Sequence, residues 1–293
     1  MQMCLYRQPL GGFMIKIIAD STAYLPKEYA KENDITVVPL RYLLGEKEYE
    51  EGFPGTFDEF FKEFTATKIF PKTSQPSLEL FTEEYNKAIA NGDEVLVFTI
   101  GSNFSGTFSV ANLAKDQCID PSKVTVFDSQ GLAQTICGYV MEAVNMRKDG
   151  KSISEIVSHL EKCVEKSSIV FVPDTLEYIY KGGRIGKVSA TIGSILQIKP
   201  IVICNKNELS NKKSFGMQKA IKDMFAMIPQ NINRLFILHL AKKEGFEAFK
   251  QTAYRMLESR VDKDKIEILE GEVGPVVGTY AGPAVGFAWT AQP

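Results

Sequence analysis

The alternation of strand-like and helix-like segments predicts an α/β protein for this chain of 293 residues. Short apolar runs rich in β-branched residues recur along the chain, and between them lie segments whose apolar residues follow helical spacing. This order is the one expected of mainly parallel sheets covered by helices. The length fits two such units, divided near residues 165–168. We therefore predict two α/β/α domains, an N-terminal one over 14–166 and a C-terminal one over 167–293.

The N-terminal unit begins with an apolar, β-branched strand at 14–19, followed by a Ser-Thr turn. Residues 57–66 carry four phenylalanines at three- and four-residue spacing, which predicts a helix. Another helix has its apolar face over 78–89, and Ser77 is a suitable N-cap for it. The remaining expected elements are strands at 35–40, 94–100 and 123–128 and helices at 105–115, 131–148 and 152–166.

The C-terminal unit opens with an apolar strand at 169–173, and its polar segment 206–216 is typical of a hairpin. Its other expected elements are strands at 198–204, 234–240 and 265–270 and helices near 175–181, 187–196, 218–228 and 243–260. The chain then runs into a Gly/Pro-rich stretch over 273–290, to which the pattern assigns no element.

The composition is that of an ordinary globular protein, 44% hydrophobic and 24% charged with a net charge of −2. There is no basic surplus and no basic run with interleaved aromatics, so we expect neither nucleic acid nor an anionic membrane surface as a partner. No apolar run approaches the ~18 residues of a membrane span. We expect a monomer, and the dispersed cysteines without a CxxC pair indicate reduced, buried thiols and hence a cytoplasmic protein. These cysteines are Cys4, Cys118, Cys137, Cys163 and Cys204.

The periodic pattern starts only at Met14. Residues 1–13 contain no hydrophobic core of a secretory signal. We expect them to be a disordered extension.

Two hydroxyl-rich turns, TSQPS at 73–77 and GSNFSGT at 101–107, are the most informative motifs. The second lies between a strand and a helix, which places unpaired backbone N–H groups and hydroxyls at a helix N-terminus, where an anion is favoured. The alternative is that the serines only cap helices, Ser77 in one turn and Ser102 or Ser105 in the other. Neither turn has a general base, a metal cluster or a phosphate-clamping lysine nearby in the sequence. The pattern therefore indicates that an anion is bound rather than transformed.

Other motifs carry weaker signals. The glycine-rich segment 181–194 matches neither GxGxxG nor GxxxxGK[ST], so it indicates dinucleotide binding only weakly. The alternative interpretation is a tight turn at a domain junction. Arg184 could pair with a carboxylate across that junction. In the DST segment at 20–22, the Asp and Ser residues either cap the following helix or organise the turn after the first strand. The alternative is a catalytic aspartate, which lacks a partner of known spacing. We expect structural roles for His159 and His239, because no triad or metal-ligand spacing joins them. The absence of a GxSxG elbow argues against a serine hydrolase.

Two segments, 131–146 and 188–196, are apolar nearly all round. A helix of that kind is by default buried in a core. It can equally line a deep apolar pocket, and both interpretations stay open.

With these motifs in place, the chain resembles the DegV family over residues 14–293. The matching blocks follow one another in a single order and are ADSTAYLP (19–26), Gly45 with Gly52, TSQPS (73–77), IGSNFSGTFSVANLA (100–114), VFDSQGLAQTICG (126–138), DTLEYIYKGGRIG (174–186), GSILQIKPI (193–201) and GPVVGTYAGPAVG (274–286). The resemblance implies two α/β domains with a ligand cleft between them and a long-chain fatty acid in that cleft.

The resemblance also implies which residues hold the ligand. Hydroxyls of the TSQ and SxxSGT motifs would bind the fatty-acid carboxylate, which carries over to Thr73, Ser74, Ser102 and Ser105, with Gly106 supplying backbone. Some family members are the binding subunit of a bacterial fatty acid kinase. They present the acid to a separate ATP-binding partner that phosphorylates it.

The chain departs from the family pattern at two places. The usual GTHTGPGA motif reads GTYAGPAV here, so Tyr280 and Ala281 stand where His and Thr are expected. Tyr280 can donate a hydrogen bond to a carboxylate but cannot take on positive charge. A basic segment resembling VRGRKKA reads SFGMQKA at 214–220, so two arginines that could help to dock a kinase subunit are absent.

The leading hypothesis is a non-catalytic fatty-acid-binding protein without metal or cofactor, with Tyr280 and Arg184 added to the expected ligand-binding residues. It would carry its ligand or present it to a partner such as a fatty acid kinase. One alternative is an enzyme related to small-molecule kinases or phosphotransferases, although no Walker-type loop is found. Others are a binder of a different lipid-like anion and a protein–protein module whose ligand is only structural.

Overall fold

The computed structural model describes residues 14–67, 69–184, 198–241, 243–260 and 263–293. The extension expected at 1–13 and the helix expected near 187–196 lie outside the described residues. Cys118, Cys137, Cys163 and Cys204 are buried and free, as predicted, while Cys4 lies outside them too.

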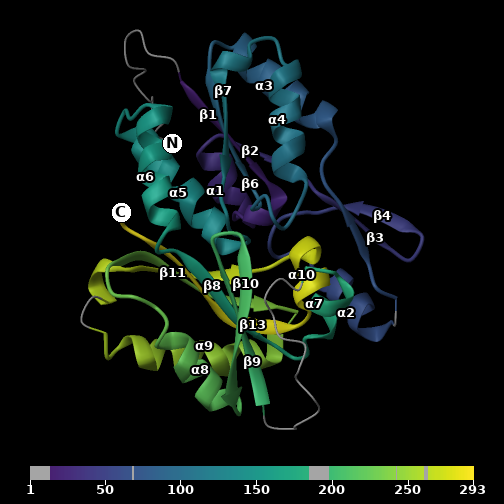
Figure 1. Ribbon diagram of the computed structural model, residues 1–293, viewed down its shortest axis with the longest axis vertical. Coiled ribbons are helices and arrows are strands. Elements are labelled where there is room, and N and C mark those ends of the chain that lie inside the picture. The colour runs from purple at the N-terminus through teal and green to yellow at the C-terminus, as the bar shows by residue number, and fades with distance from the viewer. Residues whose placement is uncertain (1–13, 68, 185–197, 242, 261–262) are drawn as a thin grey trace, which may run out of the picture.

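Most of the helices lie in three layers with the two main sheets between them, while α2 (Asp58–Ala66), α7 (Glu177–Lys181) and α10 (Pro275–Ala281) lie together at one edge (Figure 1). The outer layer of the N-terminal half comprises α3 (Leu78–Ala90) and α4 (Thr107–Gln117). The middle layer comprises α1 (Lys27–Glu32), α5 (Gln134–Lys148) and α6 (Ile153–Val164). The outer layer of the C-terminal half comprises α8 (Met217–Phe225) and α9 (Lys243–Leu257).

The first sheet is entirely parallel, and its strands lie close to the predicted ranges. In spatial order they are β2 (Ile35–Val38), β1 (Ile15–Asp20), β6 (Glu94–Thr99) and β7 (Val124–Asp128). The central strands β1 and β6 are covered by helices on both faces. They are therefore continuous apolar runs in the sequence, which made them predictable.

The second sheet is mainly antiparallel, so the expectation of parallel strands is wrong for this half of the chain. In spatial order its strands are β10 (Glu208–Phe215), β9 (Ile198–Asn205), β8 (Ser168–Pro173), β13 (Ala284–Ala291), β11 (Ile232–Leu240) and β12 (Glu267–Glu272). Only β11 and β12 pair in parallel. The turn Lys206-Asn207 joins β9 to β10, and a two-residue turn of this kind reverses the chain.

The Gly/Pro-rich stretch that closes the sequence is regular after all. It contains the short helix α10 (Pro275–Ala281) and then β13. All eight residues of β13 are buried, and the strand is inserted antiparallel between β8 and β11. A Cβ atom at Gly286 would overlap the backbone of β8, so the small residues that hide this strand in the sequence are those that let it pack closely.

Helix α5 is the centre of the molecule, because it packs against both sheets. Its apolar residues share one core with inward-facing residues of β1, β6, β8 and β13. Gly138 permits the contact with β13, since a Cβ there would lie 2.5 Å from Cγ2 of Thr290. Of the two interpretations of segment 131–146, the buried core helix is thus confirmed for α5, whose burial explains the missing polar face, while Leu132 just before the helix lines a pocket.

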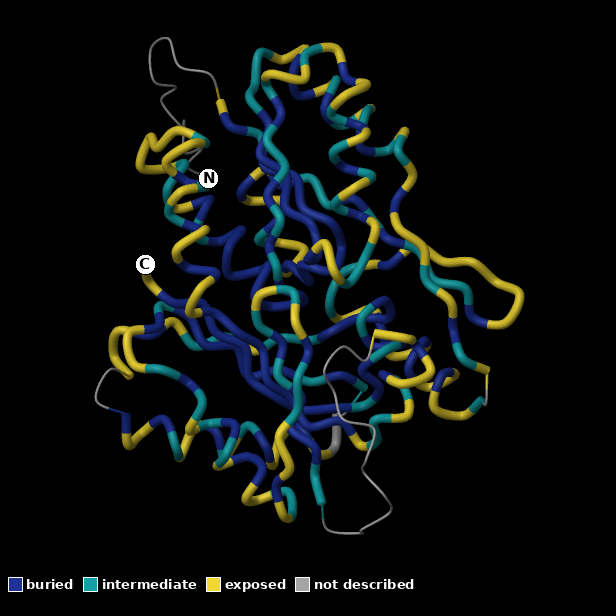
Figure 2. The backbone as a smooth tube through the Cα atoms, in the orientation of Figure 1, coloured by how far each residue is buried: buried dark blue, intermediate teal, exposed yellow. Residues whose placement is uncertain are grey.

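A third, small sheet was not predicted. Its strands are β3 (Arg41–Leu44), β4 (Lys47–Glu50) and β5 (Lys72–Ser74), and between the last two lies α2 (Asp58–Ala66). We call residues 41–74 the arm. Figure 2 shows its exposed hairpin standing away from the buried sheets.

The arm crosses from the N-terminal half to the C-terminal half of the chain. The Phe64 ring of α2 lies 5.1 Å from the ring of Tyr178 in α7 (Glu177–Lys181), and Phe61 packs on Gly278 of α10. The domain division near residue 166 stays a prediction. The contacts show that residues before this point help to build the C-terminal side of the junction.

Candidate functional site

The TSQPS turn spans the end of the arm and the start of α3. Thr73 and Ser74 belong to β5, where Thr73 pairs with Tyr42 of β3. Ser77 is the N-cap of α3, and its hydroxyl accepts a hydrogen bond from the Leu80 N–H at 3.4 Å. The predicted cap is therefore confirmed, and it leaves the hydroxyls of Thr73 and Ser74 for other contacts.

The GSNFSGT turn connects β6 to α4. The Ser105 hydroxyl accepts a hydrogen bond from the Thr107 N–H at 3.2 Å and lies 2.8 Å from the Thr107 hydroxyl. Gly106 brings this turn against the other one, because a Cβ at Gly106 would lie 2.7 Å from Oε1 of Gln75. The structure thus brings together two turns that are separated by residues 78–100 in the sequence.

A pocket of about 800 Å³, including the part open to solvent, lies where these turns meet the C-terminal half. Its polar lining is Thr73, Ser74, Gln75, Ser105, Gly106, Arg184 and Tyr280. Its apolar lining is Leu40, Ile100, Phe104, Leu132, Phe171, Ile179, Leu209, Val276, Val277 and Ala281.

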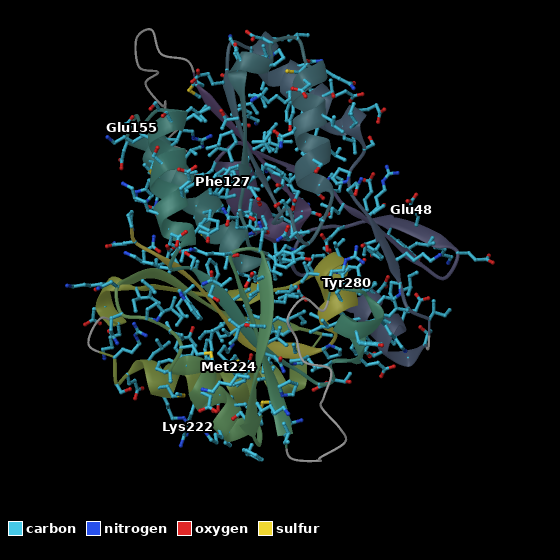
Figure 3. The ribbon with its side chains drawn as sticks, in the orientation of Figure 1. Glu48, Phe127, Glu155, Lys222, Met224 and Tyr280 are labelled. Carbon is cyan, nitrogen blue, oxygen red and sulfur yellow. The ribbon has the colours of Figure 1, made fainter. Side chains whose placement is uncertain are left out.

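The polar end of the pocket is organised around Tyr280, which Figure 3 labels on α10. Its hydroxyl lies 2.6 Å from the Thr73 hydroxyl. The guanidinium carbon of Arg184 lies 4.4 Å from the centre of the Tyr280 ring, and Nη1 of Arg184 donates to the Gly182 carbonyl at 2.7 Å. Arg184 therefore contacts an aromatic face and a carbonyl at this junction, and places a positive charge over the Tyr280 ring.

Six of the seven predicted ligand-binding residues line this pocket, and Ser102 does not. The Ser102 N–H and hydroxyl donate to the two carboxylate oxygens of Asp128, at 3.0 and 2.7 Å. The side-chain amide of Asn207, at the tip of the β9–β10 hairpin, donates to the Ser102 hydroxyl at 3.2 Å. Ser102 thus belongs to a contact between the two halves of the chain.

The DST segment organises the turn after β1, which is one of its predicted roles. Asp20 is fully buried and caps a short 3₁₀ turn over Ser21–Ala23. Its carboxylate accepts hydrogen bonds from the Thr22 N–H at 2.9 Å, the Thr22 hydroxyl at 2.5 Å and the Ile100 N–H at 2.7 Å. Burial raises the pKa of Asp20 to about 6, although these hydrogen bonds act in the opposite direction.

Glu51 is a second buried carboxylate, and sequence reasoning missed it. It is 3% exposed and accepts hydrogen bonds from the Val276 N–H at 2.7 Å, the Ser21 hydroxyl at 2.7 Å and the Tyr24 hydroxyl at 3.1 Å. Burial raises the pKa of Glu51 to about 7, against the effect of these hydrogen bonds. Nothing in the sequence distinguishes it from the exposed Glu48 and Glu50 beside it.

The histidines lie away from the pocket lining. His159 is within 3.2 Å of a Glu142 carboxylate oxygen, and the His239 ring packs on the Phe246 ring at 4.4 Å. These contacts agree with the structural roles expected for both. Within the described ranges, no cluster of His, Cys, Asp and Glu could hold a metal ion. None of the helices in those ranges has the length and apolar character required to cross a membrane.

Comparison with known proteins places this fold in one family. The model of the family described as "Uncharacterised protein, DegV family" matches residues 14–292. A DegV domain-containing protein of Clostridium acetobutylicum is 30% identical over 280 residues, which cover 94% of this chain and 97% of the relative.

Solved structures of DegV proteins have the same fold. The structure of DegV from Bacillus subtilis, a fatty acid binding protein, matches with a TM-score of 0.82 at 26% identity, and the match covers 96% of this chain and 100% of that chain. The fatty acid (stearic acid)-binding protein from Eubacterium ventriosum matches with a TM-score of 0.82 at 27% identity, covering 95% of this chain and 98% of that chain. The chain described here belongs to the DegV family and has its α/β fold.

Proposed function

We propose that this protein binds a long-chain fatty acid in the pocket between its two halves. The carboxylate lies at the polar end, beside Thr73, Ser105 and Tyr280, and the hydrocarbon tail runs along the apolar lining. The observation that carries the proposal is the lining of the pocket, in which hydroxyls from three separated segments border a space with many apolar side chains, and two of these hydroxyls, those of Thr73 and Tyr280, are in contact. The fatty acid binding of DegV from Bacillus subtilis and of the stearic acid-binding protein from Eubacterium ventriosum supports it.

The apolar lining accounts for affinity. A 16-carbon acid buries about 14 methylene groups, which at ~0.8 kcal/mol each correspond to roughly 11 kcal/mol of gross transfer free energy. Ordering the chain and losing translational freedom offset several kcal/mol of this amount. Binding between micromolar and nanomolar therefore needs no strong contact to the headgroup.

The polar end accounts for orientation. Hydroxyl groups contribute ~1 kcal/mol per hydrogen bond to a carboxylate, and a charged partner contributes somewhat more. Thr73, Ser105 and Tyr280 offer such donors, and Arg184 supplies a positive charge at the same end. Ser74 and Gly106 complete this end of the lining, whereas Ser102 stands outside it.

We further propose that the protein carries its ligand or presents it to a partner rather than transforming it. The described lining offers hydroxyls, an amide and a guanidinium, but no carboxylate or imidazole that could act as a general base. A separate ATP-binding fatty acid kinase subunit is the partner that this arrangement suits. Such an enzyme would need the carboxylate at the mouth of the pocket, where Arg184 is exposed.

Native mass spectrometry of the purified protein tests the proposal, with the released small molecules identified after denaturation. We expect one fatty acid per chain, or stoichiometric uptake of added oleate or palmitate by the delipidated protein. A protein that is isolated empty and takes up neither acid would overturn the proposal.

A matched comparison tests orientation. The double variant Thr73→Val, Ser105→Ala is expected to lose affinity for oleate but much less affinity for methyl oleate. Equal losses for the acid and its ester would contradict recognition of the carboxylate.

A further inference from the structure

The first turn of α10 is held by two side chains from the N-terminal half. The Val276 N–H donates to Oε1 of Glu51 at 2.7 Å, and the Val277 N–H donates to the Tyr24 hydroxyl at 3.2 Å. The N–H groups in the first turn of a helix have no acceptor within the helix, so they depend on partners of this kind. Glu51 and Tyr24 therefore fix where α10 begins.

The Glu51 carboxylate is tied to the same half of the chain by further hydrogen bonds. Oε2 of Glu51 accepts from the Ser21 hydroxyl at 2.7 Å, and Oε1 accepts from the Tyr24 hydroxyl at 3.1 Å. The Ser21 hydroxyl in turn accepts from the Leu40 N–H at 3.0 Å. The carboxylate thus links three segments in the interior: the turn after β1, the arm to which Glu51 belongs, and α10.

The far end of α10 meets the arm a second time, through the contact between Tyr280 and Thr73. Between the two attachment points, α10 contributes Val276, Val277 and Tyr280 to the lining of the pocket.

We propose that Glu51 is a positioning residue for the headgroup of the ligand, acting through α10 on the Tyr280 hydroxyl. The inference rests on the proposed function, because it assigns Tyr280 to the carboxylate of a fatty acid. Glu51 itself does not line the pocket.

The charge of Glu51 is part of this role. An ionised carboxylate accepts hydrogen bonds more strongly than a neutral carboxyl group, so the hold on the Val276 N–H weakens when Glu51 is protonated. The pKa of about 7 places that change near neutral pH. Asp20 adds to the rise in this pKa through its charge, and Tyr24 counteracts it by its hydrogen bond. The charge of Glu51 also contributes to the raised pKa of Tyr42 in β3. Helix α10 contains no charged residue.

A buried acid is costly to ionise, so its retention beside a pocket is typical of a functional site rather than of a stabilising one. A residue with only a structural role would affect binding of any ligand in proportion to its effect on stability. A positioning residue affects the preference for one headgroup, and the two roles can therefore be separated.

The test compares oleate with methyl oleate, which share a tail and differ in the charge of the headgroup. Wild type, Glu51→Gln and Asp20→Asn are titrated with both ligands at about pH 8 and about pH 6. Glu51→Gln keeps the shape of the side chain but removes its charge. Asp20→Asn is the matched control, because it neutralises a second buried acid whose partners, Thr22 and the Ile100 N–H, lie outside α10.

At about pH 8, the preference of Glu51→Gln for oleate over methyl oleate is expected to be about fivefold below that of wild type, the equivalent of weakening one hydrogen bond. The difference in this preference between Glu51→Gln and wild type becomes smaller at about pH 6, because Glu51 of the wild type is itself protonated there. Comparing the two proteins at each pH cancels the titration of oleate. Asp20→Asn keeps the wild-type preference at about pH 8. At about pH 6 it loses less of that preference than wild type does, because removing the charge of Asp20 lowers the pKa of Glu51.

If Glu51→Gln prefers oleate over methyl oleate as strongly as wild type does at both pH values, the inference is overturned and the proposed function stands. Should Glu51→Gln fail to fold, Tyr24→Phe removes the phenol that holds the Val277 N–H, and a preference unchanged in this variant overturns the inference equally. A wild-type protein that binds oleate no better than methyl oleate overturns recognition of the carboxylate, and this inference with it.

Discussion

The hydroxyl groups of Thr73 and Tyr280 lie 2.6 Å apart although 207 residues separate them in the sequence. One comes from the arm and the other from α10, so the contact closes the polar end of the pocket from both halves of the chain. Two hydroxyls in contact share one hydrogen, which leaves the other free to be donated to a ligand. The pair therefore acts as a unit.

Removing either hydroxyl of this pair is expected to weaken oleate binding. Thr73→Val and Tyr280→Phe each lower the affinity about fivefold, because each costs ~1 kcal/mol of hydrogen bonding. The double variant loses less than the product of the two effects, since the hydroxyls depend on each other. Calorimetric titration of all four proteins measures this coupling, and strictly multiplicative losses would show that the two hydroxyls act independently.

Ser102 and Ser105 belong to one turn but are expected to behave differently. Ser105→Ala removes a hydroxyl from the pocket lining and lowers the preference for oleate over methyl oleate. Ser102→Ala removes a partner of Asp128 and Asn207, and it lowers the free energy of unfolding by ~1–2 kcal/mol without changing that preference. Titration and urea denaturation of both variants check this, and a loss of preference in Ser102→Ala would restore the role implied by the family motif.

The Tyr280→His variant restores the residue of the usual family motif and should give binding a new pH dependence. A histidine with an ordinary pKa of ~6.5 gains positive charge as the pH falls, which favours a bound carboxylate. Relative to wild type, the affinity of the variant for oleate is expected to rise between about pH 8 and about pH 6. The same titrations with methyl oleate are the control, because an uncharged headgroup gains little from a cation.

How far the sequence predicts this protein depends on the kind of residue that carries each feature. The strands β1 and β6 were predictable because burial on both faces demands continuous apolar runs. The arm was not, because β3 and β4 are short and β4 is exposed along its whole length, so no alternation of polar and apolar residues marks it. Strand β13 was hidden by the glycine and alanine residues that its close packing requires.

The residues of the site also fall into those that the local sequence reveals and those that only the folded structure reveals. Thr73 and Ser105 lie in hydroxyl-rich turns that are recognisable locally, and Tyr280 lies in a motif that keeps the first two glycines and the proline of the family pattern but has Tyr280 and Ala281 in place of His and Thr. Ser102 has the same local pattern as Ser105, but the hairpin tip at Asn207 engages it from the other half of the chain. Glu51 becomes identifiable only when the arm folds over α10. Contacts between distant segments decide both cases, and spacing within one segment cannot reveal them.

Asn207 is expected to hold the GSNFSGT turn in place. Its backbone has a positive φ of 61°, its N–H donates to the Gln130 carbonyl at 2.7 Å, and its side-chain amide reaches Ser102 and Asp128. Asn207→Gly keeps the turn conformation and removes the side chain, so the backbone is not strained. We expect faster amide hydrogen exchange at residues 101–107 and a loss of ~1–3 kcal/mol of stability. Unchanged exchange in this segment would show that the turn is held by its own cap alone.

The stability of the protein is expected to fall as the pH rises through the neutral range. The pKa values of Asp20 and Glu51 rise from 3.8 to about 6 and from 4.5 to about 7 on burial, so the folded chain binds more protons than the unfolded chain. By linkage, their contribution to the free energy of unfolding is fully present below about pH 4 and is lost as the pH passes about 7. For Glu51 alone the change is on the order of 3 kcal/mol.

Glu51→Gln removes this dependence at one of the two sites. We expect urea denaturation to show that the free energy of unfolding falls less in the variant than in wild type between about pH 5 and about pH 8. The difference between the two falls is ~1–3 kcal/mol. Asp20→Asn is expected to reduce the pH-dependent loss of stability in the same way, but over a range that ends nearer to pH 6, the pKa of Asp20 in the folded protein. A variant that parallels the wild type at both pH values would mean that Glu51 does not titrate in this range. The buried acid beneath α10 would then contribute to the pocket through its hydrogen bonds alone, with no charge that changes near neutral pH.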